Sequence, residues 1–287
     1  MPLDSIAEIL ASCSERNLAF WQVVLEADVE ERQVSAGASF EKMRATWRAM
    51  LDSAESYDGG LRSVSGLSGG DGELMLRYAA GGAALGGGYM SEVIATALCV
   101  GESNACMRKI VAAPTAGACG VLPAVLVPLY RRGEREEDIL RALYTAAGIG
   151  AVINSRASIS GAAGGCQAEI GSASAMAAGA LAQLRGGGPE QTANALAMAL
   201  KNLMGLICDP VAGLVEVPCV KRNVIGAVNA VSCADMALAG ITSRIPADEV
   251  IDCMGIVGER LPREFRETAR GGLAATPTGR AAWKKLK

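Results

Sequence analysis

Three of the nine cysteines stand in surroundings that differ from those of an ordinary core thiol. Cys166 follows the glycine-rich run 160–165, Cys208 precedes an Asp-Pro pair, and Cys219 follows a proline. Glycine and proline let a backbone turn around a bound group and present N–H groups to it. Because thiolates are soft ligands, this combination is typical of a metal or iron–sulfur site. We therefore treat these three cysteines as candidate metal ligands.

The spacing of the same cysteines leaves a second interpretation open. They are separated by 41 and then 10 residues, which matches neither compact ferredoxin nor zinc-ribbon spacings. A free cysteine commonly packs as a small buried hydrophobe, so a packing role is the alternative for each of the nine. An odd, sparse set of cysteines also argues against a secreted disulfide scaffold. We expect reduced thiols in a cytoplasmic protein, and the N-terminus shows no signal peptide.

The absence of histidine restricts the chemistry further. Imidazole metal sites, Ser-His triads and histidine general bases are excluded within this chain. The 27 basic and 30 acidic residues give a formal net charge of −3 without a lysine-rich block, so we expect no nucleic-acid or anionic-membrane partner. The apolar share of 51% and the low charge exclude a disordered chain.

Small residues carry most of the hydrophobicity, because the chain has 35 glycines but only 3 Trp, 5 Tyr and 3 Phe. Segments 139–155 and 170–184 are almost free of charge, which favours helices buried on all faces. Alternating Val and Ile runs are scarce. The sequence therefore predicts an all-α, mostly α-helical fold, with Gly/Ala-rich buried central helices surrounded by amphipathic helices and with loops that carry the cysteines.

The N-terminal part differs in composition from the rest. Ser5 and Glu8 form an S-x-x-E capping pattern that predicts a helix start, and segment 17–57 has the pattern of two amphipathic helices. Charges thin out and glycine clusters appear near residue 59. We expect residues 1–58 to be helices packed on a core domain, 59–287, that is continuous with them.

One stretch, 110–130, is uncharged and long enough to span a bilayer. Three prolines and two glycines interrupt it, and proline breaks helix hydrogen bonding. We therefore expect buried core here and no membrane partner.

Five segments in one order resemble the α subunit of iron–sulfur-dependent L-serine dehydratase. The resemblance covers nearly everything from residue 59 to residue 279. The matching segments are SGLSGGD (65–71), KIVAAPTAGACG (109–120), SISGAAGGCQAE (158–169), CDPVAGLVEVPCVKRN (208–223) and GGLAATPTG (271–279).

The resemblance implies an oxygen-sensitive, PLP-independent lyase that converts L-serine to pyruvate and ammonia. It also implies that Cys166, Cys208 and Cys219 hold a [4Fe-4S] cluster, while the other six cysteines are left to packing. Three thiolates leave one of four irons open as a Lewis acid for the substrate hydroxyl. A separate β subunit or domain accompanies the α subunit in that family, so the resemblance implies a β subunit as the partner of this chain.

The resemblance also points to side chains that bind L-serine. Ser65, Ser68 and Thr115 lie in loops with glycine-exposed N–H groups that suit a carboxylate, Lys109 adds a charge, and Ser160 precedes the first cysteine. Each has a plainer interpretation: a helix cap or turn for the hydroxyls, a surface charge for Lys109.

Two departures from the family pattern leave the substrate open. Arg108 stands where family members have glycine, and Ala118 stands where they often have serine, so L-threonine or L-cysteine could replace L-serine. A PLP-dependent dehydratase and a non-catalytic iron–sulfur subunit are two further hypotheses for the whole chain. The general base is unassigned: it is a Lys, Cys or carboxylate of this chain, or it comes from the partner chain.

Overall fold

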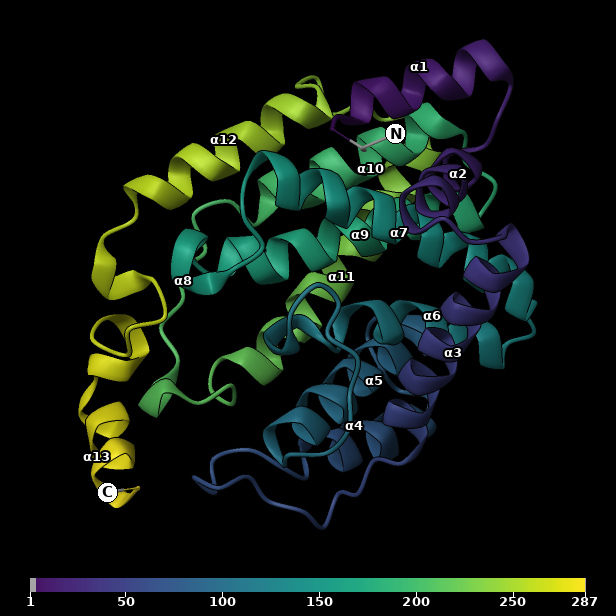
Figure 1. Ribbon diagram of the computed structural model, residues 1–287. Coiled ribbons are helices and arrows are strands. Elements are labelled where there is room, and N and C mark those ends of the chain that lie inside the picture. Colours follow the sequence, from purple (N-terminus) through teal and green to yellow (C-terminus); the bar gives the residue numbers. More distant parts are fainter. Residues whose placement is uncertain (1–3, 287) are drawn as a thin grey trace.

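The computed structural model describes residues 4–286, which form a bundle of α-helices (Figure 1). Within these residues there is no β-strand, and one isolated parallel bridge joins Cys208 to Arg266. The predicted all-α fold is therefore confirmed. The α-helices are α1 (Ile6–Arg16), α2 (Phe20–Arg32), α3 (Ala36–Glu55), α4 (Asp71–Ala80), α5 (Gly87–Ala105), α6 (Val121–Arg131), α7 (Glu136–Arg156), α8 (Gly161–Gly164), α9 (Ser172–Leu184), α10 (Pro189–Asn202), α11 (Cys219–Leu238), α12 (Ala247–Arg260) and α13 (Pro277–Lys285).

Shorter helical segments connect these helices. A π-helical turn, η2 (Gln167–Gly171), lies between α8 and α9. Such turns are rare and occur frequently at functional sites. The remaining short segments are η1 (Ala116–Ala118), η3 (Val211–Gly213), η4 (Arg263–Phe265) and η5 (Gly272–Ala275).

Helix α9 lies at the centre of the bundle and packs against α7, α10 and α11 (Figure 1). Its residues 172–182 are all buried, as predicted for an Ala/Gly-rich central helix. Glycine allows the close approach to α7, because a Cβ on Gly179 would lie 2.3 Å from Cδ1 of Ile149. The small side chains thus set the spacing of the central helices.

Helix α7 departs from the prediction. We expected segment 139–155 to be buried on every face, but Ala147, Ala151 and Asn154 are exposed. These residues recur at helical spacing, so they form one solvent-facing stripe. The stripe has no charge, and the sequence pattern therefore resembled that of a fully buried helix.

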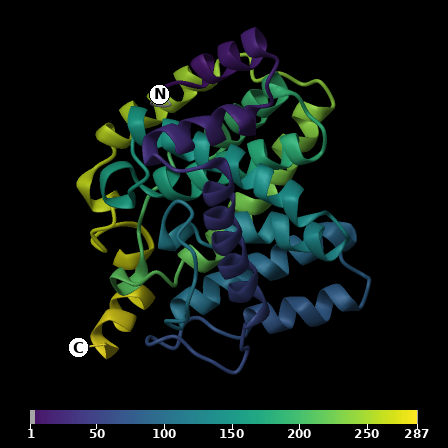
Figure 2. The ribbon, with the colours of Figure 1, turned by 45° about the vertical axis from the view of Figure 1, so that its right-hand side comes forward.

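The first three helices lie on the outside of the bundle: in Figure 2, α1 lies at the top and α3 runs down the middle of the near face. Ser5 accepts a hydrogen bond from the backbone N–H of Glu8 at 3.1 Å, so the predicted helix start is confirmed. Trp47 of α3 is fully buried, with its ring centroid 5.5 Å from that of Tyr130. Side chains of α1–α3 belong to the same hydrophobic core as α7 and α9.

The uncharged stretch 110–130 forms η1 and α6, and residues 121–129 of α6 are buried. This agrees with its predicted place in the core. Across residues 4–286, no helix has both the length and the apolar character that crossing a membrane requires.

Two central helices begin next to the candidate ligands. Cys166 directly precedes η2, which continues into α9, and Cys219 is the first residue of α11. The C-terminal segment runs down the edge of the bundle in Figure 1. It brings residues 265–267 beside Cys208.

Candidate functional site

The three cysteines singled out from the sequence meet in one buried site. Cys166, Cys208 and Cys219 are 3%, 3% and 9% exposed. The thiols of Cys166 and Cys208 are within hydrogen-bonding reach of each other, and Cys219 is close enough to interact electrostatically with both. Residues 42 and 53 positions apart along the chain thus share one site, although no compact motif joins them.

Close backbone packing lets the loop before Cys166 reach this site. Gly165 has a φ of +75°, a conformation that favours glycine. A Cβ on Gly161 would lie 3.1 Å from Sγ of Cys208 and 2.5 Å from Oε2 of Glu169. Glycine at position 161 therefore leaves room for a thiol and a carboxylate at the N-terminus of α8.

Charges and burial set the protonation of the thiols in the metal-free chain. The pKa of Cys166 is lowered because the Cys208 thiol donates a hydrogen bond to it and because the Arg222 cation is close. The pKa of Cys208 is raised by the same hydrogen bond and by burial. Burial raises the pKa of Cys219 to about 12. Cys166 is therefore the thiol of the three that most readily becomes a thiolate.

A carboxylate stands beside the thiols. Oε2 of Glu169 lies 3.9 Å from Sγ of Cys208, and Oε1 accepts a 2.7 Å hydrogen bond from Thr115. Burial raises the pKa of Glu169 above its usual value. Glu169 belongs to η2, so the π-helical turn after Cys166 brings its carboxylate into the thiol site.

Asn223 fixes the loop that carries Thr115. Its amide donates to the carbonyls of Gly117 at 2.8 Å and Cys219 at 2.9 Å, and its oxygen accepts from the N–H of Gly120 at 2.8 Å. Asn223 is 2% exposed. One buried amide therefore ties the Thr115 loop to the first turn of α11.

The loop that carries Ser65 and Ser68 faces a different carboxylate. Ser63 donates to Oε2 of Glu216 at 2.6 Å, and Ser65 donates to the same oxygen. Glu216 is buried and lies three residues before Cys219. Ser68 is buried, and its backbone N–H donates to Oγ of Ser63.

The glycine-exposed N–H groups of this loop already have an acceptor inside the protein. The carboxylate of Glu102 accepts hydrogen bonds from the N–H groups of Gly69, Asp71 and Gly72 at 3.2, 2.9 and 3.1 Å. Glu102 is 1% exposed and also accepts from the Tyr57 hydroxyl at 2.5 Å. These N–H groups lie at a helix start, as expected, but the anion that they bind in this structure is the internal carboxylate of Glu102, which caps α4.

The other two predicted substrate-site residues are more exposed. Ser160 lies at the N-terminus of α8, where its carbonyl accepts from the N–H of Gly164 at 2.9 Å and its side chain makes no capping bond. Lys109 is exposed and lies in a groove against α3, which Arg44, Arg48 and Asp52 also line. The structure thus brings Thr115 to the thiols and gives Lys109 neighbours on another element.

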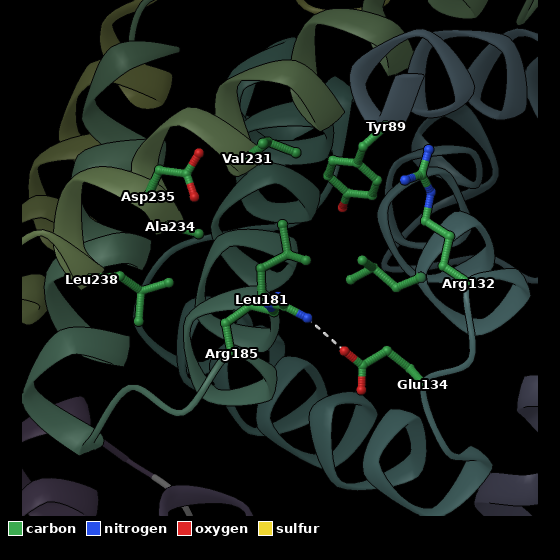
Figure 3. A pocket seen from close by; sticks show the side chains of 10 residues that line it. Tyr89, Arg132, Glu134, Leu181, Arg185, Val231, Ala234, Asp235 and Leu238 are labelled. Atoms are coloured by element: carbon green, nitrogen blue, oxygen red, sulfur yellow. Dashed lines mark hydrogen bonds and ion pairs between the residues drawn. The ribbon is translucent and has the colours of Figure 1, made fainter. Parts of the chain in front are cut away.

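A separate hollow of about 420 Å³ lies at the C-terminal end of α11, away from Cys219 (Figure 3). Leu181 and Val231 contribute to its apolar wall. Its two arginines already have partners, since Arg185 pairs with Glu134 at 2.6 Å and Arg132 pairs with Glu92 at 2.9 Å. None of the nine cysteines lines this hollow.

Several residues of the thiol site were not assigned from the sequence. Glu169 is the only charged residue between Arg156 and Arg185, and that isolation was an available signal. Asp209 and Arg222 lie inside a motif that carries the resemblance, yet neither was given a role. Their contacts join residues far apart in the sequence, which spacing alone does not reveal.

The fold and the site together define a helical protein with a buried three-thiol centre. The family model described as serine dehydratase alpha chain matches residues 15–274. The chain therefore belongs to the serine dehydratase alpha chain family.

Individual relatives resemble the chain over most of its length. It is 46% identical over 283 residues to the "Probable L-serine dehydratase, alpha chain" of Bacillus subtilis, covering 98% of this chain and 94% of the relative. It is 39% identical over 283 residues to the "L-serine dehydratase, alpha chain" of Peptoniphilus asaccharolyticus, covering 96% of each. The "L-serine dehydratase TdcG" of Escherichia coli is 48% identical over 181 residues, which are 62% of this chain and 40% of that protein.

Proposed function

We propose that this chain is the α subunit of an L-serine dehydratase, an L-serine ammonia-lyase that forms pyruvate and ammonia. Elimination of water from L-serine gives 2-aminoacrylate, which tautomerises to an imine and hydrolyses to pyruvate and ammonium. The names of the relatives support this activity. The observation that carries it is the convergence of Cys166, Cys208 and Cys219 in one buried site.

We propose a [4Fe-4S] cluster as the cofactor of this site. Three buried thiols with glycine on one side suit a soft metal centre, and the chain has no histidine to suit other metals. Across residues 4–286, no three Cys, Asp or Glu donors surround a position for a single metal ion. A cluster does not require three ligands around one metal position, because each thiolate binds its own iron. When bound, the cluster supplies a Lewis-acidic iron for the substrate hydroxyl.

The protein groups around the thiols bind and orient the substrate in this proposal. Thr115 and the carboxylate of Glu169 form a polar wall beside Cys208. Burial of the site excludes water, which strengthens electrostatic interactions with a bound zwitterion. Ser65, Ser68, Ser160 and Lys109 stay candidate contacts of the substrate.

A partner chain completes the active site in our proposal. Removal of the α-proton near neutral pH needs a base, and imidazole is absent from this chain. The alpha chain names of the relatives imply a β chain, which is the source we propose for that base. Nine free cysteines are consistent with the reducing cytoplasm as its location.

The test is an anaerobic assay of pyruvate formed from L-serine. The chain is reconstituted with iron and sulfide and combined with its β chain. We expect pyruvate and ammonium in equal amounts, with slower turnover of L-threonine and L-cysteine. A faster reaction with L-cysteine would assign a desulfidase instead. No product from any of the three amino acids would overturn the proposed function.

A further inference from the structure

Asp209 and Arg222 form a buried ion pair that has no role in the reaction outlined above. The Arg222 guanidinium donates to Oδ1 of Asp209 at 2.9 Å. The Arg222 side chain is 16% exposed and the Asp209 side chain 3%. Withdrawing two charges from water is unfavourable, so a buried pair is weak evidence for stability by itself. Its other contacts indicate what it does.

Arg222 touches the surroundings of all three thiols. Its second terminal nitrogen donates to the carbonyl of Ile207 at 2.8 Å, next to Cys208. The guanidinium is within hydrogen-bonding reach of Cys166. Arg222 itself lies on the first turn of α11, three residues after Cys219. One rigid cation thus links three segments that are distant in the sequence.

Asp209 uses its other oxygen to hold the C-terminal segment. Oδ2 accepts from the N–H of Leu273 at 2.7 Å. A Cβ on Gly272, which has a φ of +58°, would lie 2.3 Å from the same oxygen. Next to Asp209, the N–H of Cys208 donates to the carbonyl of Phe265 at 2.8 Å, and the N–H of Glu267 donates to the carbonyl of Cys208 at 2.9 Å. Residues 265–273 therefore lie fastened along the Cys208 loop.

We propose that Asp209 and Arg222 act as a positioning pair for the three-thiol site. Arg222 holds the thiol segments in register and places a fixed positive charge against the thiolates. Asp209 orients Arg222 and fastens residues 265–273 over Cys208. The part that concerns a bound cluster rests on the proposed function, whereas the fastening belongs to the chain with or without metal.

Four variants separate these roles: Arg222→Gln, Arg222→Lys, Asp209→Asn and, as the matched control, Lys221→Gln. Lys221 is the neighbouring cation on the exposed side of the same turn, where it pairs with Asp71 at 2.8 Å. Folding of each variant is checked by far-UV circular dichroism. Arg222→Gln leaves the buried Asp209 carboxylate without its partner, which can prevent folding. In that case the double variant Arg222→Gln/Asp209→Asn replaces Arg222→Gln, and Asp209→Asn is its reference.

The first measurement is limited trypsin digestion of the iron-free chain, followed at Arg263, Arg266 and Arg270. We expect Asp209→Asn to be cut in this segment at least tenfold faster than the wild type, and Lys221→Gln at the wild-type rate. Cutting of Asp209→Asn at the wild-type rate would overturn the fastening role. The digestion tests the fastening role even if the chain takes up no iron. Failure to take up iron would overturn only the proposed cofactor.

The second measurement is the midpoint potential of the reconstituted cluster, followed by electron paramagnetic resonance. Loss of a nearby cation disfavours electron uptake, so we expect a lower potential in Arg222→Gln. Arg222→Lys should restore a potential close to that of the wild type, and Lys221→Gln should not change it. A wild-type potential in Arg222→Gln would overturn the electrostatic role, because a merely structural pair does not move this readout.

Discussion

The cysteines outside the thiol site differ sharply in their surroundings. Cys99 and Cys119 are buried, and burial raises the pKa of each to about 12. Cys253 is exposed. Because the thiolate is the reactive form, we expect iodoacetamide at pH 8 to label Cys253 in the folded, iron-free chain and to spare Cys99 and Cys119. Peptide mass spectrometry measures the labelling, and urea-unfolded chain is the control in which all of them react. Equal labelling of Cys119 and Cys253 in the folded chain would contradict this burial.

Glu169 gives the stability of the iron-free chain a definite pH dependence. Burial raises its pKa in the folded chain, so the folded form binds the proton more tightly than the unfolded form. The stability linked to this proton is fully present below the unfolded pKa and is lost as the pH rises through the folded pKa. We therefore expect Glu169→Gln to gain stability over the wild type at pH 7.5 and little at pH 4. Urea unfolding at both pH values measures this, with exposed Glu259→Gln as control. A larger gain at pH 4 would contradict the raised pKa.

The sequence could predict part of this site and not the rest. The three cysteines were marked by the glycine and proline beside them, and Thr115 by the motif around it. The role of Glu169 depends on a π-helical turn, which aims the carboxylate at Cys208. Local patterns do not encode such a turn. Lys109 also lies in a matching motif, and the fold places it in a groove against α3, so its substrate role stays a prediction.

At the scale of elements, α4 depends on a buried carboxylate from α5. The Glu102 carboxylate accepts hydrogen bonds from three backbone N–H groups at the start of α4. Glu102→Gln keeps the shape but offers a single acceptor oxygen without charge, so buried donors lose their partner. We expect a loss of about 2 kcal/mol in the free energy of unfolding, measured with urea.

Glu92 provides a matched control on the same helix. It forms an exposed ion pair with Arg132, and such surface pairs contribute at most about 1 kcal/mol. Glu92→Gln should therefore change stability by at most half as much as Glu102→Gln. Equal losses in the two variants would show that the capping of α4 by Glu102 stabilises the fold no more than a surface ion pair does.

The helices themselves were largely predictable, whereas their ends and loops were not. Apolar spacing and the Ser5 cap predicted α1, and the uncharged run after Ile170 predicted α9. The 65–71 loop looked like an open anion site, because glycine exposes N–H groups wherever it occurs. Its acceptor, Glu102, lies 31 residues beyond Asp71, so only the tertiary structure reveals it.

At the scale of the whole molecule, the chain has no histidine, and we propose that its partner chain supplies the base. Our account predicts that the reconstituted chain alone makes pyruvate at least a hundredfold more slowly than the chain with its β chain. Titration of the β chain against a fixed amount of this chain measures the dependence. Full activity from this chain alone would contradict it and would assign the base to a lysine, cysteine or carboxylate of these 287 residues.

The central claim is that Cys166, Cys208 and Cys219 together hold an iron–sulfur cluster. The most direct measurement is the iron and acid-labile sulfide content of the chain after anaerobic reconstitution, for the wild type, for the serine variant of each of the three cysteines, and for Cys253→Ser as control. The account predicts about four irons and four sulfides per chain in the wild type and the control, and a clear loss of both in each of the three variants. Full cluster content in any of those three variants, or none in the wild type, would contradict it.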